Sequence, residues 1–301
     1  MIIERRVKDT LTPVEMNHGD TLRFRFADGT DWDMTLEETD AEIIEENYAA
    51  TGHARDGDIS AYGFSAGVKI NGADYELRRV VGAQESFYEP WEIDGVNIWF
   101  DAAAVAFSGR GGFMGEKDWL HWQVCQPRRA ARFAVQESGR SVCPEPMALW
   151  YETPRLSLDI GECYNGEDCW MGPFMGAVAH CGLDVNMPAG TTLYAPVDFD
   201  DHYYFNSLAA GFGNNRWRGV RRWPDGARWA LQAHHVVELL VEQNRPLARG
   251  RAYATTAGTA VGAHEHTHFI FKVTEQEGEF FLDPWIFFWQ MFRDAREAGE
   301  T

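Results

Sequence analysis

The stretch that decides the fold of the second half of this chain is Gly262-Ala-His-Glu-His-Thr-His-Phe-Ile-Phe-Lys-Val273. Because side chains on a β-strand alternate between its two faces, an extended conformation places His264, His266 and His268 on one face. The alternate residues, including Phe269, then take the other face. Neutral imidazole is a favoured ligand for zinc and similar ions, and three aligned imidazoles are an unusual packing choice. The stretch therefore predicts a strand that carries part of a metal site.

A tetrahedral zinc site needs ligands from a second element, and the chain offers one upstream. In His180-Cys-Gly-Leu-Asp184 the histidine and the aspartate are four residues apart. A four-residue spacing puts two side chains on one face of a helix, and an even spacing does the same on an extended segment. Gly182 and the β-rich flanks disfavour the helix, but in either conformation the two side chains can converge on one ion.

These motifs resemble those of the lysostaphin-type (LytM-like) zinc endopeptidases. The segment His180–Asp184 is similar to the family's opening H-x-G-x-D motif, and His266-Thr-His268-Phe is similar to its closing H-x-H-F motif. Leu231-Gln-Ala-His234-His235-Val lies in the place of the family's middle histidine, and Leu282-Asp283-Pro284 resembles its usual ending. The resemblance covers about residues 160–290, and it depends on the order of the three motifs more than on any one of them.

The resemblance implies the role of each site residue. His180, Asp184 and His268 would bind Zn²⁺, the only cofactor expected. His266 would act as general base or as a donor to the transition-state oxyanion, and His234 would be the second catalytic histidine. Three protein ligands and one water form the open, catalytic kind of zinc site. Zinc lowers the pKa of bound water to about 7, and nearby unligated histidines can move a proton and stabilise a tetrahedral oxyanion.

The middle motif departs from the family pattern, which normally reads aromatic-x-His-Leu. Here two histidines are adjacent in Gln232-Ala-His234-His235-Val, so the choice between them stays open, and the register favours His234. His264 stands where the family usually has a small residue. His264 is therefore expected to be an extra ligand, a partner of the ligands or a surface residue. His235, where it is not the catalytic histidine, is expected to be a partner of the ligands.

The fold class expected from the sequence is mainly β. Residues 1–146 predict a β-rich N-terminal domain of unknown role, with alternating strands such as Thr21–Phe26 and a hairpin at Asn71-Gly72. Residues 147–301 predict a LytM-like antiparallel β-sheet domain that ends in a helix over Asp283–Glu297. The acidic stretch from Glu37 to Glu46 predicts one solvated face of a surface helix.

Composition limits the partners of the protein. The formal net charge of −19 disfavours nucleic acid and anionic membrane surfaces, because both require clustered Lys and Arg. No apolar run is long enough for a transmembrane helix, and no signal peptide follows Met1, so a cytoplasmic location is expected, with export by another route as the alternative. The odd number of cysteines predicts reduced thiols. The oligomeric state is not indicated by the sequence.

The substrate is predicted less sharply than the metal. The resemblance implies cleavage of peptide bonds in glycine-rich or peptidoglycan crosslink-like peptides. Trp217, Trp223 and Arg218 are candidates for substrate binding, although an aromatic and arginine cluster without a ligand fits the sequence as well. One alternative is a zinc-dependent lyase that acts with the same site on a uronate-containing polysaccharide. A second alternative is a non-catalytic binding or scaffold protein.

Overall fold

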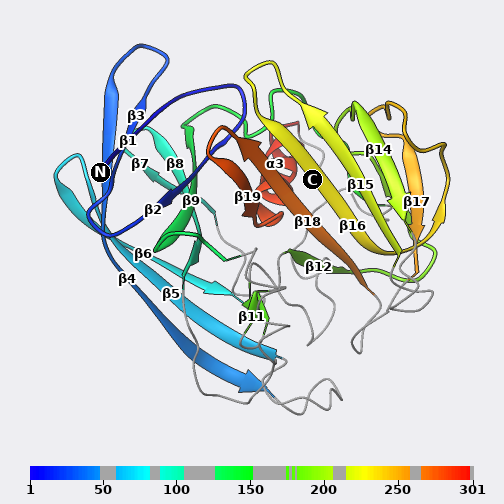
Figure 1. Ribbon diagram of the computed structural model, residues 1–301, viewed down its shortest axis with the longest axis horizontal. Coiled ribbons are helices and arrows are strands. Elements are labelled where there is room, and N and C mark those ends of the chain that lie inside the picture. Colours follow the sequence, from blue (N-terminus) through cyan, green and yellow to red (C-terminus); the bar gives the residue numbers. More distant parts are fainter. Residues whose placement is uncertain are drawn as a thin grey trace.

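The structure is a computed structural model that describes residues 1–47, 59–81, 89–104, 126–151, 174–175, 178–179, 182–205, 215–257 and 266–298. Within these ranges the chain consists mainly of β-strands, followed by one α-helix near the C-terminus (Figure 1). This confirms the mainly β fold class and the C-terminal helix. The predicted domain boundary near residue 146 stays a prediction.

A five-stranded sheet is formed by the first part of the chain, in the order β1-β3-β4-β5-β6. These strands span Ile2–Arg6, Thr21–Arg25, Asp31–Asn47, Ile59–Ile70 and Ala73–Val81. Only β1 and β3 pair in parallel within it. The β5–β6 hairpin turns at Asn71 and Gly72, whose φ angles of 45° and 91° both lie in the left-handed region. That geometry suits Asn-Gly, and it confirms the predicted hairpin.

The helix predicted for the acidic stretch 37–46 is wrong, because these residues belong to β4 and pair with β5. Three alternate residues just before them, Trp32, Met34 and Leu36, are all buried. Such a period-two pattern commits the chain to a strand, and the long pairing with β5 extends it through the charged residues. Charge alone marks a solvated surface and does not distinguish a strand from a helix.

A four-stranded sheet has the order β2-β9-β8-β7, with bounds Thr12–Met16, Ala131–Glu137, Val96–Ala103 and Trp91–Ile93. Both of its faces are covered, so β8 is buried along its whole length. Ile98, Phe100 and Phe133 pack in one hydrophobic cluster with the five-stranded sheet, whereas Trp99 and Ala134 pack in a second cluster. Because neighbouring residues on a strand face opposite sides, this sheet is the wall shared by the two cores.

The third sheet has eight strands and holds the histidines. Its main path is β12-β18-β16-β15-β14, while β13 and β17 pair with each other, β17 with β16 and β19 with β18. All of its pairs are antiparallel. The strands span Leu183–Asn186, Thr192–Tyr194, Asp201–Phe205, Asn215–Arg222, Arg228–Leu239, Ala252–Thr256, His266–Glu275 and Gly278–Leu282 for β12 to β19. A short hairpin, β10 (Phe174–Met175) and β11 (Val178–Ala179), pairs separately.

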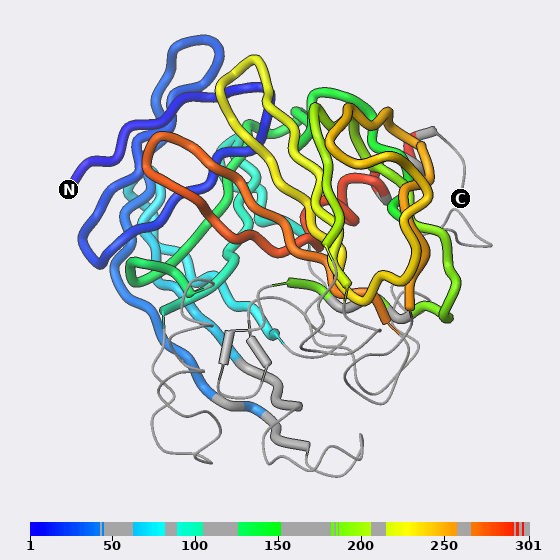
Figure 2. Tube along the Cα trace, turned by 45° about the vertical axis from the view of Figure 1, so that its right-hand side comes forward, coloured from blue at the N-terminus to red at the C-terminus, as the bar shows by residue number. Residues whose placement is uncertain are grey.

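Helix α3, Trp285–Ala298, lies between the four-stranded sheet and the eight-stranded sheet (Figures 1 and 2). The carboxylate of Asp283 caps it by accepting a hydrogen bond from the backbone N–H of Trp285 at 2.9 Å. Phe287 packs on Phe271 of β18 with ring centres 3.9 Å apart. On the other side, Trp289 meets Trp99 of β8 edge to face at 5.5 Å. The helix thus fills the second core.

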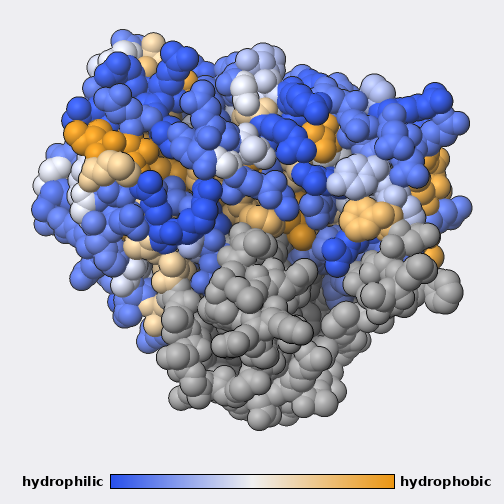
Figure 3. Space-filling view, in the orientation of Figure 1, coloured by the Kyte–Doolittle hydropathy of each residue, from blue (hydrophilic) through white to orange (hydrophobic). Residues whose placement is uncertain are grey.

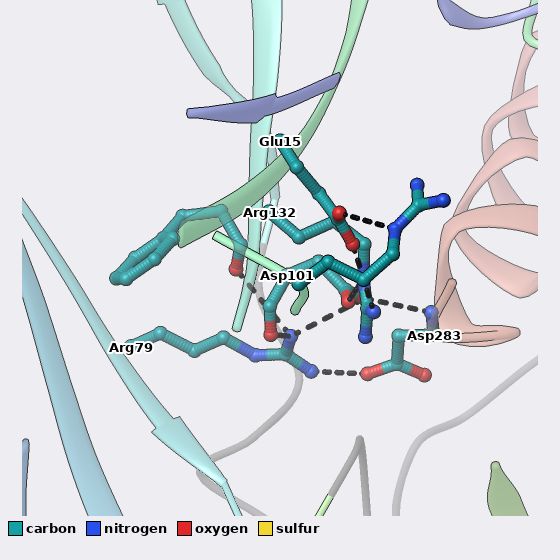
Figure 4. Close-up of polar contacts among 7 residues, drawn as sticks. Glu15, Arg79, Asp101, Arg132 and Asp283 are labelled. Carbon is teal, nitrogen blue, oxygen red and sulfur yellow. Dashed lines mark hydrogen bonds and ion pairs between the residues drawn. The ribbon is translucent and has the colours of Figure 1, made fainter. Parts of the chain in front are cut away.

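A buried network of charged groups joins the three sheets where α3 begins (Figure 4). Asp101 of β8 accepts hydrogen bonds from Arg132 Nε at 2.6 Å and from the backbone N–H of Asp283 at 2.8 Å. Arg79 of β6 donates to the carboxylate of Asp283 and to the carbonyl oxygen of Asp101. Glu15 of β2 lies 3.7 Å from Arg132. Burial raises the pKa of the Asp283 carboxyl, and the Arg79 guanidinium opposes that shift.

On the face shown in Figure 3, the described part of the surface is largely hydrophilic, with some apolar residues among the polar ones. This agrees with the net charge of −19. Within the described ranges, no helix has both the length and the apolar character needed to cross a membrane. Cys143 is a buried free thiol whose pKa is raised by burial to about 12. The other cysteines, Cys125, Cys163, Cys169 and Cys181, lie outside the described residues.

Candidate metal and catalytic centre

Strand β18 begins with two of the predicted site residues, His266 and His268, which are 5% and 7% exposed. Because they are two residues apart on a strand, they lie on the same face. Thr267 lies between them on the opposite face, where its hydroxyl hydrogen-bonds Thr256 Oγ1 at 2.8 Å. The predicted strand is thus confirmed from His266 onward. His264 lies outside the described residues.

Strand β12 brings the position of Asp184 to His268. The two residues are direct partners in the antiparallel register of β12 and β18. Residues that lie directly opposite in such a pair share one face of the sheet. Of the two conformations open to the upstream motif, the extended one is therefore observed at Asp184. His180 and the side chain of Asp184 lie outside the described part of the structure.

Gly182 has a steric reason to be glycine. A Cβ atom at this position would lie 2.1 Å from the carbonyl oxygen of Phe269 and 3.0 Å from His268 Nε2. The first of these atoms belongs to the backbone of β18 and cannot rotate away. The absent side chain therefore allows the backbone at Gly182 to approach β18 closely at Phe269 and His268, a constraint that the sequence alone did not reveal.

Replacing Gly182 by alanine is expected to push β12 away from β18 and to destabilise the protein by about 1–3 kcal/mol, the usual range for overpacking. Urea unfolding would measure the loss. The matched control is Gly63→Ala in β5, where a Cβ atom would meet only the side chains of Glu42 and Ile44, each at 3.1 Å. Equal stability of the two variants would contradict the close approach described for Gly182.

Strand β16 supplies the two adjacent histidines, and it does so through a β-bulge. Arg216 pairs with His234 but Asn215 pairs with Val236, so His235 is an extra residue in β16. Its φ angle is 60°, in the left-handed region that few non-glycine residues adopt. In a regular strand the two neighbours would point to opposite faces, and a bulge can re-aim one of them.

The bulge brings both imidazoles to the histidines of β18. The ring of His234 lies 5.1 Å from that of His268, and the ring of His235 lies 4.7 Å from that of His266, measured between ring centres. The rings of His234 and His235 are 6.5 Å apart. Four imidazoles therefore gather where the first residues of β18 lie beside the middle of β16. We call His234, His235, His266 and His268 the histidine cluster.

Hydrogen bonds from β17 and the residue after it hold the bulge. The carbonyl oxygen of His235 accepts from the backbone N–H of Ala257 at 2.7 Å and from Thr256 Oγ1 at 3.1 Å. A left-handed non-glycine residue costs about 1–3 kcal/mol and persists only where its surroundings fix it. Such strain is commonly found at functional sites, and here it coincides with the predicted catalytic histidines.

The chemistry of these positions fits a zinc ion. Imidazole nitrogen and carboxylate oxygen are both common zinc ligands, and the register places one position of each kind, His268 and Asp184, opposite each other. Among the residues that the structure describes, no three His, Cys, Asp or Glu side chains could hold a metal ion by themselves. The predicted ligand set draws on His180 and on the Asp184 side chain, which are outside that part.

The tryptophans proposed for substrate binding are core residues, and this corrects the expectation of a ligand-facing surface. Trp217 is 0% exposed and stacks on Tyr253, and Trp223 is 4% exposed and packs against Trp229. Trp217 lies in β15 and Trp223 follows the end of that strand. Both side chains belong to the second hydrophobic cluster. Arg218, on the other face of β15, donates a hydrogen bond to the hydroxyl of Tyr203 at 3.2 Å and stays a candidate.

His202 illustrates a histidine with a packing role. It is buried beside Trp217, whose indole N–H donates to His202 Nδ1 at 3.2 Å. Burial lowers its pKa, so the neutral imidazole is favoured. It belongs to β14, at the far edge of the eight-stranded sheet from β12.

Comparisons with known proteins give similar folds and no sequence-level match. No protein-family model matches the chain, and no curated protein matches it. Solved structures similar to this chain are described as lysostaphin, LytM-type and M23-family peptidases.

Two of these structures illustrate how remote the similarity is. The catalytic domain of lysostaphin from Staphylococcus simulans is 20% identical with a TM-score of 0.32, over 39% of this chain and 86% of that domain. A zinc-containing peptidase from Vibrio cholerae is 12% identical with a TM-score of 0.29, over 81% of this chain and 85% of that one. Because these values are low, we base the function on the geometry of the histidines.

Proposed function

We propose that this chain is a zinc-dependent peptidase that hydrolyses peptide bonds at the histidine cluster. The observation that carries the proposal is the pairing of His234 with His268 and of His235 with His266, at ring distances of 5.1 and 4.7 Å. A strained bulge at His235 assembles these pairs, which a regular strand would not do.

The residues that would hold the zinc ion are His180, Asp184 and His268. Three protein ligands leave a position open for water or substrate, as catalytic zinc sites require. Zinc bound there would lower the pKa of a water ligand and polarise the scissile carbonyl. The direct pairing of Asp184 with His268 supports a shared ion, because the two positions lie on the same face.

The proton-transfer pair in this proposal is His266 and His235. His266 lies two residues before His268 on the same face of β18, so it is suited to accept a proton from water attacking beside the ion. His235 packs against His266 and would donate a hydrogen bond to the oxyanion that forms. This assigns to His235 the role that the register of the motif had given to His234, because the ring of His235 packs against His266 whereas the ring of His234 packs against His268.

Both rings of this pair lie in surroundings that strengthen such interactions. His266 and His235 are largely buried, and water competes less with hydrogen bonds made in a buried site. The bulge is fixed through the carbonyl of His235, so the imidazole is held in place before substrate arrives. A positioned donor needs no reorganisation during the reaction, which is the basis of electrostatic catalysis.

Replacing His235 or His266 by alanine is expected to lower kcat by about 10²–10⁴-fold, the usual contribution of general acid–base catalysis. Zinc content should be retained, because neither residue is proposed as a ligand. Steady-state kinetics and metal analysis of each purified variant would measure the two effects. Loss of zinc together with activity in His266→Ala would show that His266 is a ligand and not the base.

The substrate class follows from the family resemblance and is part of the proposal. Incubation with a glycine-rich peptide, a peptidoglycan crosslink peptide and a uronate-containing polysaccharide, followed by mass spectrometry, tests it. Peptide fragments whose formation stops on chelation and resumes with added zinc are expected. Unsaturated sugar products would instead establish a lyase, and no product from any substrate would favour a binding protein.

A further inference from the structure

His234 has no place in the catalytic scheme above, yet it is part of the histidine cluster. Continuing the register of β16 and β18 by one residue beyond the Ala233–Phe269 pair places His234 opposite His268. Its ring is the one that contacts His268, at 5.1 Å and an interplanar angle of 46°. His234 therefore lies beside the proposed zinc ligand His268, whereas its neighbour His235 lies beside the proposed base His266.

The separation of these two rings matches two imidazoles that share one ion. A zinc–nitrogen bond is about 2.0–2.1 Å long, so each ring centre lies roughly 3.2 Å from the metal. At a tetrahedral angle, two such rings have centres about 5 Å apart. The distance between His234 and His268 is 5.1 Å. The two rings therefore have the spacing of two ligands of one zinc ion, and neither strand has to move to bring them to it.

A second contact orients His234 for this role. Its Nε2 atom lies 3.5 Å from Oε1 of Gln232, which is two residues earlier on the same strand and therefore on the same face. Metal-binding histidines usually donate their other ring N–H to an oxygen atom, which fixes the tautomer. If Nε2 carries the proton for Gln232, the lone pair is left on Nδ1.

We propose that His234 is a fourth protein ligand of the zinc ion, beside His180, Asp184 and His268. The inference rests on the proposed function, since it needs zinc at this site. Four protein ligands make a closed site, and closed sites are normally structural. A peptidase with this ligand set holds His234 in the position that water must take, so His234 has to leave before the reaction starts.

Zinc affinity of the purified full-length protein, measured by competition with a chromogenic chelator, tests the proposal. His234→Ala is expected to weaken zinc binding by more than about 10-fold, because loss even of a group that merely supports a ligand costs 10–100-fold. The neighbouring substitution His235→Ala is the matched control, and it should leave the zinc affinity unchanged. Gln232→Ala should weaken binding less than His234→Ala does.

Spectroscopy gives a readout that does not depend on activity. In the Co²⁺-substituted protein, His234→Ala should change the visible absorption bands of the ion, whereas His235→Ala should not. X-ray absorption at the zinc edge should show three imidazole ligands in the wild type and two in His234→Ala. His234→Gln, checked by circular dichroism, provides a second variant in case the alanine variant does not fold.

Two different failures can be told apart. If the wild type binds zinc and cleaves peptides but His234→Ala keeps its affinity and its cobalt spectrum, the fourth-ligand assignment is overturned and the proposed function stands. If the wild type binds no zinc, the proposed function and this assignment are both overturned.

Discussion

Replacing His268 by alanine is expected to remove both the zinc ion and the peptidase activity. His268 occupies the centre of the proposed site. It is opposite Asp184 in the strand register, its ring contacts His234, and a Cβ atom added at Gly182 would lie 3.0 Å from its Nε2 atom. A variant without this ligand should bind zinc more than about 100-fold more weakly, beyond the 10–100-fold lost with supporting groups alone. Metal analysis and peptide hydrolysis at fixed free zinc would measure it.

The control for this experiment is His202→Ala. That histidine is also buried in the eight-stranded sheet, but it belongs to β14 and bonds to Trp217. Its loss should lower stability and leave the amount of bound zinc in the folded protein unchanged. Full zinc content in His268→Ala would reject the ligand assignment. The same substitution at Asp184 should behave like His268→Ala, because both positions belong to one proposed ligand set.

Replacing Asp101 by alanine is expected to be among the most destabilising changes in the protein, at about 3–5 kcal/mol, the cost of breaking a buried ion pair by removing one partner. Asp101 is fully buried and accepts hydrogen bonds both from Arg132 and from the backbone of Asp283 (Figure 4). Its loss leaves a buried guanidinium without this carboxylate and loosens the start of α3. Urea unfolding monitored by tryptophan fluorescence would measure the change.

An exposed ion pair provides the comparison for Asp101. Arg78 and Glu76 are paired on β6 with side chains that are mostly in solvent. Glu76→Ala should therefore change the free energy of unfolding by less than about 1 kcal/mol. If Asp101→Ala has an effect as small as that of Glu76→Ala, the buried network does not stabilise the junction between the sheets.

Regular elements were predictable where local pattern and packing agree. The alternation in Thr21–Arg25, the hairpin turn at Asn71-Gly72 and the C-terminal helix all appear as the sequence indicates, and the structure adds the cap that Asp283 provides. In each case one short-range rule determines the backbone: period-two burial, a positive φ angle, or a side chain that satisfies a free N–H group. The prediction for the acidic part of β4 was wrong, because pairing with β5 and not the composition of the segment determines its conformation.

The sequence predicted which residue types form the candidate site, but it did not predict which histidine of β16 contacts which histidine of β18. The spacing of His266 and His268 predicts a shared face, which the strand confirms. The bulge at His235 has no short-range signal, since a left-handed histidine depends on hydrogen bonds from Thr256 and Ala257, about twenty residues later. Without the bulge, the sequence could not show which of two adjacent histidines meets which residue of β18.

The burial of Trp217 is the other feature that could not be predicted from the sequence. Trp217 alternates with arginines along β15, and such a pattern is compatible with a ligand surface or with a core. The outcome depends on Tyr253 of β17, which stacks on Trp217 with ring centres 3.8 Å apart. Only the tertiary arrangement decides between the two.

Anomalous diffraction at the zinc absorption edge, from crystals of the protein grown with zinc, tests the central claim most directly. One strong anomalous peak is expected within bonding distance of His268 and Asp184, at the end of β18 where the histidine cluster lies. A peak bonded to His235 and His266 instead would exchange the ligands and the proton-transfer pair. The absence of any peak near β18 would contradict the assignment of this chain as a zinc-dependent peptidase.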